Sequence, residues 1–213
     1  LLIFKAGLIF SFGLVAGTTS MSNQKTAVDS SPAGALELRQ VLQQAELIFD
    51  RKTIEAAIDK LAQRLNVRLG EAAPLVLCVM QGGLMFTGKI MPLLPLDAEF
   101  DYIHATRYGN STRGDALEWL AYPKKKLENR TVLILDDILD EGHTLAAIEQ
   151  YCRERGAKEV ISAVLLQKRH DRLATGMSCE YIALEVDDRY VFGYGMDYKG
   201  KLRHLDEIYA ISS

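Results

Sequence analysis

The sequence predicts an α/β protein with a mainly parallel β-sheet. Three runs rich in apolar residues, 74–80, 132–135 and 159–167, are as expected of parallel strands that helices cover on both faces. The first two runs lead through glycine-containing turns into segments whose apolar residues recur at helical spacing. Repeated strand–turn–helix units build a parallel sheet, and such sheets bind ligands at the carboxyl ends of their strands.

The bulk composition fits one globular domain and argues against some functions. The chain has 213 residues, of which 48% are hydrophobic and 25% charged, which suits a single complete core. A net charge of −3 argues against an electrostatic nucleic-acid binder. The three cysteines are widely spaced and form no Cys-x-x-Cys pair, which is typical of reduced thiols in the cytosol. We therefore expect a cytoplasmic protein that binds neither nucleic acid nor membranes.

The first 34 residues stand apart from the remainder of the chain. Residues 1–17 are almost wholly apolar and resemble a signal-peptide core or a short membrane anchor. An ordinary polar segment follows from Met21, so our preferred interpretation is that residues 1–20 are an over-extended start outside the working protein. A membrane-proximal leader is the alternative. Residues 21–34, rich in Ser, Ala, Pro and Gly, are expected to be flexible, which leaves residues 35–213 as the domain.

Periodicity predicts the helices and strands outside the three apolar runs. Apolar residues fall at helical spacing over residues 38–48 and again over residues 54–65, where Thr53 is suited to the helix start. We expect the residues of these two stripes to pack in the core and to have no catalytic or binding role. Further short strands are predicted at residues 181–184 and 207–211.

A long hairpin is predicted in the middle of the chain. Residues 99–107 alternate like a strand, residues 108–115 are polar and glycine-rich, and residues 116–122 are apolar again. Because polar, glycine-rich connections are mobile and often functional, we expect this hairpin to fold over a site as a lid.

The stretch that follows the 132–135 strand indicates ligand binding. The acidic pair Asp136-Asp137 is followed by the polar turn Asp140-Glu141-Gly142-His143-Thr144 and then by a helix. Backbone N–H groups at a helix N-terminus bind phosphate, Gly142 lets the backbone come close, and Thr144 adds a hydroxyl donor. The carboxylates would repel bare phosphate, so sugar hydroxyls or a hydrated Mg²⁺ are their natural partners. A ligand with both phosphate and ribose fits the whole stretch. The alternative is a buried strand whose acidic end is merely solvated.

Residues 132–144 closely resemble the phosphoribosyl pyrophosphate (PRPP) motif of the type I phosphoribosyltransferases: an apolar strand, two acidic residues, two apolar residues and Asp-x-Gly-x-Thr. Glu141 and His143 depart from the usual Thr and Lys. The resemblance implies the family fold, a twisted, mainly parallel sheet flanked by helices, with a small hood formed by the chain ends. It also implies that Asp136 and Asp137 hold the ribose hydroxyls, and that Asp140 lies beside the purine N7 as the catalytic general base.

Two other segments resemble functional loops of this family. Gln81-Gly82 falls at the pyrophosphate loop, where the purine-salvage branch carries a non-proline cis peptide, here Met80-Gln81; Gln81 replaces the frequent Lys. The catalytic flexible loop usually carries a Ser-Tyr pair, which falls at Arg107-Tyr108. Tyr108 matches this lid motif and Arg107 does not.

The C-terminal third resembles the hypoxanthine–guanine branch of the family, so that the likeness covers roughly residues 45–211. Lys168, Tyr190 and Val191 fall at the positions that bind the purine, through its 6-oxo group, its ring face and its edge. Asp197 falls at a position that holds Mg²⁺ with pyrophosphate, with Asp136 as a second candidate ligand, and Arg203 at one that binds pyrophosphate oxygens.

The resemblance implies a purine-salvage enzyme that transfers the 5-phosphoribosyl group from PRPP to hypoxanthine or guanine and releases pyrophosphate. It further implies Mg²⁺ as cofactor and a homo-oligomer, a dimer or a tetramer. Two alternatives stay open. One is a phosphoribosyltransferase for another base, such as xanthine or adenine. The other is a non-catalytic regulator that senses PRPP or a nucleotide on the same fold.

Overall fold

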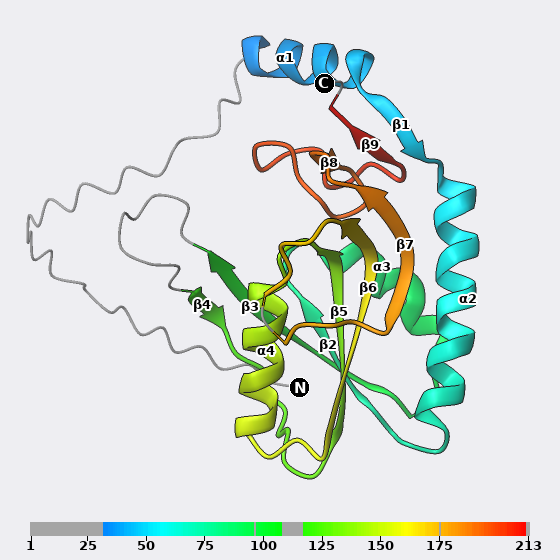
Figure 1. The fold of residues 1–213 in the computed structure, drawn as a ribbon, viewed down its shortest axis with the longest axis vertical. Coiled ribbons are helices and arrows are strands. Elements are labelled where there is room, and N and C mark those ends of the chain that lie inside the picture. Colours follow the sequence, from blue (N-terminus) through cyan, green and yellow to red (C-terminus); the bar gives the residue numbers. More distant parts are fainter. Residues whose placement is uncertain (1–31, 96, 108–116, 175, 212–213) are drawn as a thin grey trace, which may run out of the picture.

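A six-stranded sheet forms the centre of this computed structural model, which describes residues 32–95, 97–107, 117–174 and 176–211 (Figure 1). The strand order is β4-β3-β2-β5-β6-β7; β4 pairs antiparallel with β3, and all the other pairs are parallel. The predicted mainly parallel sheet is therefore confirmed. Its strands are β2 (Leu75–Val79), β3 (Glu99–Arg107), β4 (Leu117–Ala121), β5 (Thr131–Leu139), β6 (Glu159–Arg169) and β7 (Tyr181–Asp187).

Helices cover both faces of this sheet, and alternate strand residues serve the two faces. Val76 and Leu133 pack on the side of α2 (Arg51–Leu69) and α3 (Leu84–Ile90), which the short 3₁₀ turn Met91–Leu93 follows. Their neighbours Leu77 and Val132 pack on the side of α4 (His143–Glu154). Because side chains alternate along a strand, an unbroken apolar run supplies both cores, which explains the composition of β2 and β5.

A second, three-stranded sheet forms a hood above the carboxyl ends of the main strands (Figure 1). It joins β1 (Glu46–Phe49), β9 (Ile208–Ala210) and β8 (Val191–Phe192) in the order β1-β9-β8, with β9 antiparallel to both neighbours. The helix α1 (Pro32–Gln44) leads into β1. The two ends of the chain thus build the hood together, as the family resemblance implied.

The structure corrects the predicted helix over residues 38–48. That helix ends at Gln44, and Glu46–Phe49 instead pairs with the final strand. Apolar residues at 45 and 48 fit a helical stripe, but the pairing with a strand about 160 residues away decides the local structure, as tertiary context often does for short segments. The next helix begins at Arg51, because the side chain of Asp50 accepts a hydrogen bond from Thr53 N at 2.8 Å.

Several predictions fall on parts of the chain that lie outside the described residues. They concern residues 1–20, most of the 21–34 segment and the lid, including Tyr108. Arg107 ends β3. Within the described ranges, none of the helices is both long enough and apolar enough to cross a membrane.

Candidate active site

The acidic pair is buried inside β5, which runs four residues beyond the predicted 132–135 strand. Asp136 and Asp137 are 8% and 9% exposed. Asp137 N donates to Asp136 Oδ1, and Ile138 N donates to Asp137 Oδ1, each at 2.9 Å. Burial raises the pKa of both carboxyls, and the charge of Asp137 raises the pKa of Asp136 further, to well above its usual range. Burial therefore disfavours two negative charges in this pair.

The turn between β5 and α4 lines a cavity of about 190 Å³ at the carboxyl end of the sheet. Gly142 adopts φ 80°, and a side chain there would place Cβ 2.7 Å from Met177 Cγ. Both the left-handed backbone and the close contact require glycine. The residues on either side, Asp140 to Leu145, line the cavity. The helix N-terminus and the cavity thus coincide, as an anion site requires.

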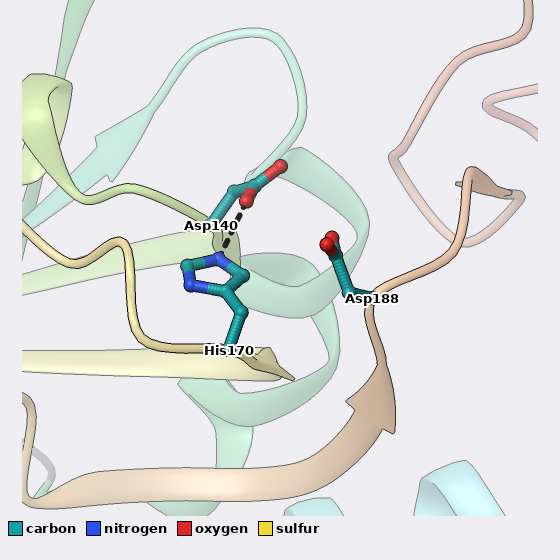
Figure 2. Close-up of side chains that lie close together, drawn as sticks. All are labelled: Asp140, His170 and Asp188. Carbon is teal, nitrogen blue, oxygen red and sulfur yellow. Dashed lines mark hydrogen bonds and ion pairs between the residues drawn. The ribbon is translucent and has the colours of Figure 1, made fainter.

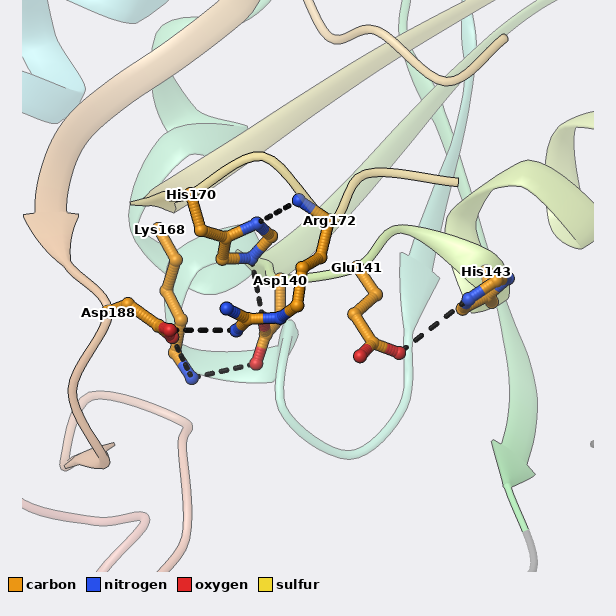
Figure 3. Close-up of polar contacts among 7 residues, drawn as sticks. All are labelled: Asp140, Glu141, His143, Lys168, His170, Arg172 and Asp188. Atoms are coloured by element: carbon orange, nitrogen blue, oxygen red, sulfur yellow. Dashed lines mark hydrogen bonds and ion pairs between the residues drawn. The ribbon is translucent and has the colours of Figure 1, made fainter. Parts of the chain in front are cut away.

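Asp140 has a different environment from the acidic pair (Figure 3). Lys168 Nζ donates to its Oδ2 at 2.7 Å, and His170 Nε2 lies 2.8 Å from its Oδ1. Partial burial acts to raise the pKa of Asp140, but the hydrogen bonds from Lys168 and His170 outweigh burial and hold the pKa below its usual range. Asp140 is therefore an ionised carboxylate at neutral pH.

Asp140, His170 and Asp188 place ligand atoms within 4.8 Å of one another, a spacing that could hold a metal ion (Figure 2). Lys168 Nζ, however, lies 2.7 Å from Asp140 and 3.9 Å from Asp188, and Arg172 pairs with Asp188 at 2.8 Å (Figure 3). These two cations already balance both carboxylates. The cluster is therefore better described as an ion-pair network around Lys168 than as a metal centre.

Arg203 and Asp197 extend from the hood toward the same end of the sheet. Arg203 donates to Gly195 O at 2.7 Å and pairs through its second terminal nitrogen with Asp197 Oδ1 at 2.6 Å. Its Nε is buried and has no hydrogen-bond partner among the described residues. Asp197 Oδ2 accepts from Gly200 N at 2.6 Å. Gly195 and Asp197 engage two of the five guanidinium N–H groups, which leaves others for a ligand.

The loop after β2 is held tightly between the hood and the acidic pair. Met80-Gln81 is a cis peptide, as the resemblance implied. A Cβ at Gly82 would lie 1.9 Å from Asp137 Oδ2, and a Cβ at Gly195 would lie 2.1 Å from Gly82 O. Neither position has room for any side chain, so both glycines are needed for this close approach of three backbone segments.

Three cavities with shared walls connect these parts into one site. The largest, about 390 Å³, is lined by the loop after β2, the acidic pair, Thr144 and Arg203. It shares Asp137, Ile138 and Arg203 with a smaller cavity, about 190 Å³, that Asp140, Lys168, Tyr190, Val191 and Asp197 complete. Except for the lid, the structure thus brings the predicted site residues to the carboxyl end of one sheet.

The structure adds four residues that sequence reasoning missed. His104 and Thr106 line the large cavity from β3, while His170 and Asp188 surround Lys168. Alternation along β3 could have identified the first two, because polar side chains two apart at the carboxyl end of a parallel strand face one side. No local signal identifies His170 or Asp188, which follow the ends of neighbouring strands.

This arrangement defines the class of protein. A parallel sheet that presents a glycine turn at a helix N-terminus, buried carboxylates and basic side chains at its carboxyl end is suited to a sugar phosphate. The phosphoribosyl transferase domain matches residues 44–199, and the chain belongs to that family.

Known relatives and solved structures agree with this assignment. The hypoxanthine-guanine phosphoribosyltransferase of Bacillus subtilis (strain 168) is 29% identical over 164 residues, which cover 76% of this chain and 91% of the relative. The hypoxanthine phosphoribosyltransferase of Escherichia coli (strain K12) is 28% identical over 167 residues, 76% of this chain and 93% of the relative. A crystal structure of a hypoxanthine phosphoribosyltransferase from Staphylococcus aureus has the same fold, with a TM-score of 0.75 at 22% identity, over 80% of this chain and 94% of the other.

Proposed function

We propose that the protein transfers the 5-phosphoribosyl group from PRPP to a 6-oxopurine, hypoxanthine or guanine, and releases pyrophosphate. The observation that carries this proposal is the Lys168–Asp140 pair, whose atoms lie 2.7 Å apart in the cavity that Tyr190 and Val191 also line. An ammonium group only donates and an ionised carboxylate only accepts. Side by side, they complement the 6-oxo acceptor and the N–H donor at N7 of a 6-oxopurine.

The remaining predicted roles follow from the same geometry. The turn from Asp140 to Thr144 holds the 5′-phosphate at the N-terminus of α4, and Asp136 and Asp137 hold the ribose hydroxyls. Tyr190 is half-exposed and anchored through its hydroxyl to Asp197 O at 3.1 Å, which leaves a ring face for the base. Gln81 and Gly82 bind pyrophosphate through backbone groups.

The chemistry requires charge stabilisation at two places. Breaking the bond between C1′ and the pyrophosphate oxygen leaves negative charge on pyrophosphate, and the guanidinium of Arg203, which lines the cavity, stabilises it. The base loses a proton as its nitrogen attacks C1′, and Asp140 Oδ2 accepts that proton as general base. Water has to be kept from the cationic ribose, which is the role of the lid that includes Tyr108.

Mg²⁺ is the cofactor that this reaction uses, and Asp197 is the residue best suited to hold it. Each oxygen of Asp197 has one donor, from Arg203 or Gly200, and can accept a further contact at the cavity wall. Asp136 fits less well, because burial raises its pKa and so disfavours the ionised form that binds a metal ion. Held there with pyrophosphate, Mg²⁺ would neutralise negative charge on the leaving group.

The proposed setting is a homo-oligomer, a dimer or a tetramer, in the cytoplasm. Phe100 and Tyr102 of β3 are 45% and 39% exposed, and exposed apolar side chains two apart on an outer strand pair favour association. All three cysteines are unpaired, and burial raises the pKa of Cys152 to about 12, which suits unreactive thiols in a reducing compartment.

A base panel tests the proposed function. The chain would be assayed for pyrophosphate release with PRPP, Mg²⁺ and each of hypoxanthine, guanine, xanthine, adenine and uracil, with reactions lacking PRPP as control. We expect turnover with hypoxanthine or guanine and little with adenine or uracil. Xanthine belongs in the panel because a relative from Tritrichomonas foetus, 26% identical, is a hypoxanthine-guanine-xanthine phosphoribosyltransferase. Preferred turnover of adenine, or PRPP binding without turnover of any base, would contradict the proposal.

A further inference from the structure

His170 follows the end of β6, and its ring connects the backbone to Asp140 (Figure 3). Its side chain is only 3% exposed. Arg172 N donates to Nδ1 at 3.0 Å, and Nε2 lies 2.8 Å from Asp140 Oδ1. Because a backbone N–H can only donate, Nδ1 is the acceptor and carries no proton. The ring proton is therefore on Nε2, which donates it to Asp140.

Asp140 thus has one donor on each oxygen, and the two donors differ in freedom. Lys168 reaches Oδ2 with a flexible four-carbon chain, and its ammonium group is the one that has to turn toward the 6-oxo group when a base binds. His170 reaches Oδ1 with a rigid, buried ring that the Arg172 backbone holds from the other side. When Lys168 turns toward the base, His170 is the donor that stays.

We propose that His170 is a positioning residue that keeps Asp140 turned with Oδ2 toward the purine while Lys168 transfers its hydrogen bond to the base. This inference rests on the proposed function, in which Oδ2 takes the proton from the base. His170 does not take that proton itself, because Nε2 already carries one and Nδ1 is engaged by the backbone. It orients the general base and contacts no substrate atom.

The charged groups around Asp140 determine the expected pH dependence. Lys168, His170 and Arg172 face it from the end of β6 and the residues that follow, and Asp188 faces it from beyond the end of β7. The hydrogen bond from His170 is one of the causes that lower the pKa of Asp140. Loss of this donor should therefore raise that pKa, so that activity is lost at a higher pH on the acidic side of the profile.

The test compares two variants with a neighbouring control. His170→Leu fills the space of the ring with an apolar side chain and removes the donor to Asp140. His170→Gln replaces the ring N–H with an amide N–H at a similar distance from the backbone. The control, Arg169→Gln, removes the exposed ion pair between Arg169 and Asp187 at the ends of the same two strands. Each variant would be assayed for kcat and for KM of PRPP across pH, with thermal unfolding as a check of the fold.

We expect His170→Leu to lower kcat about 10- to 100-fold, the equivalent of one hydrogen bond to a charged group. KM for PRPP should stay within about twofold, because the acidic pair is untouched, and the acidic limb should move to higher pH. His170→Gln should recover most of the loss, and Arg169→Gln should match the wild type. A folded His170→Leu variant with the wild-type kcat and acidic limb would overturn the proposal, as would equal losses in the Leu and Gln variants.

An NMR measurement decides the underlying geometry without any assay. The ¹⁵N chemical shifts of His170 in the full chain should show an unprotonated Nδ1 and a protonated Nε2, and Asp140→Asn should perturb Nε2 more than Nδ1. The opposite tautomer would overturn the positioning role, even for an active enzyme. Failure of the base panel together with the expected tautomer would reject the proposed reaction while leaving the His170–Asp140 contact in place.

Discussion

Two residues, Ile138 and Leu139, separate two kinds of aspartate in this protein. Asp136 and Asp137 lie inside β5, nearly excluded from solvent, and burial raises the pKa of both. Asp140 lies in the turn that follows, 43% exposed at its side chain, and two donors lower its pKa. The difference shows that the charge of a carboxyl depends on its partners more than on its place in a motif. The buried pair suits hydrogen bonds with sugar hydroxyls, whereas Asp140 suits proton transfer.

Removing the charge at Asp140 should have the largest effect on activity. Asp140→Asn keeps the shape of the side chain and cannot take a proton from the base, so kcat should fall by about 10²- to 10⁴-fold with little change in PRPP affinity. Single-turnover kinetics would measure the chemical step directly. A near-wild-type rate in that experiment would remove Asp140 from the role of general base.

A methyl group at Gly82 should break the acidic pair without touching Asp140. In Gly82→Ala the new Cβ would lie 1.9 Å from Asp137 Oδ2 and displace that carboxyl, so PRPP should bind about 10²-fold more weakly. Gly88→Ala is the matched control, since its Cβ in α3 would meet nothing within 4 Å and should stabilise the helix by up to about 1 kcal/mol. Calorimetric titration with PRPP compares the two variants. Equal, wild-type affinities would show that the position of Asp137 does not govern PRPP binding.

A substitution of Lys168 tests the environment of Asp140, the exposed aspartate of the comparison. Lys168→Gln removes the ammonium donor from Asp140 and from the 6-oxo group, so kcat/KM for hypoxanthine and guanine should fall about 10- to 100-fold with PRPP binding little affected. The ratio of hypoxanthine to adenine turnover is the decisive measurement. If the variant keeps the wild-type ratio of hypoxanthine to adenine turnover, Lys168 does not discriminate between the two bases.

The smallest expected effect concerns stability, where the two kinds of aspartate should respond with opposite signs. Asp136 has a raised pKa in the folded chain, so its ionisation favours unfolding as the pH rises, and Asp136→Asn should stabilise the fold at neutral pH and not in acid. The pKa of Asp140 is lowered, so its ionised form favours folding above the unfolded pKa, and Asp140→Asn should destabilise the fold slightly at neutral pH. Denaturant unfolding at pH 3 and pH 7 measures both. The same sign in both variants would mean that the environments do not differ as described.

Local chemistry by itself determined most of the main sheet and the ligand turn. The apolar runs at β2, β5 and β6 have to be covered on both faces, and Gly142 marks a turn that only glycine adopts easily. These features depend on neighbours within a few residues, so periodicity and turn chemistry are enough to predict them. The motif from Asp136 to Thr144 is local in the same sense.

Only the tertiary structure decided that residues 46–49 form a strand of the hood, how the pKa of each carboxyl shifts, and the network around Lys168. Ile48 fits a helical stripe, yet it lies in the strand β1. That strand forms because β9, near the far end of the chain, pairs with β1. His170 and Asp188 gained their roles because the parallel strands β6 and β7 end side by side. The lowered pKa of Asp140 arises from Lys168 and His170, which are distant in sequence, and the raised pKa of Asp136 arises first from burial within the fold and then from its neighbour Asp137. Burial and long-range contacts act through space, and the order of residues alone does not state which ones meet.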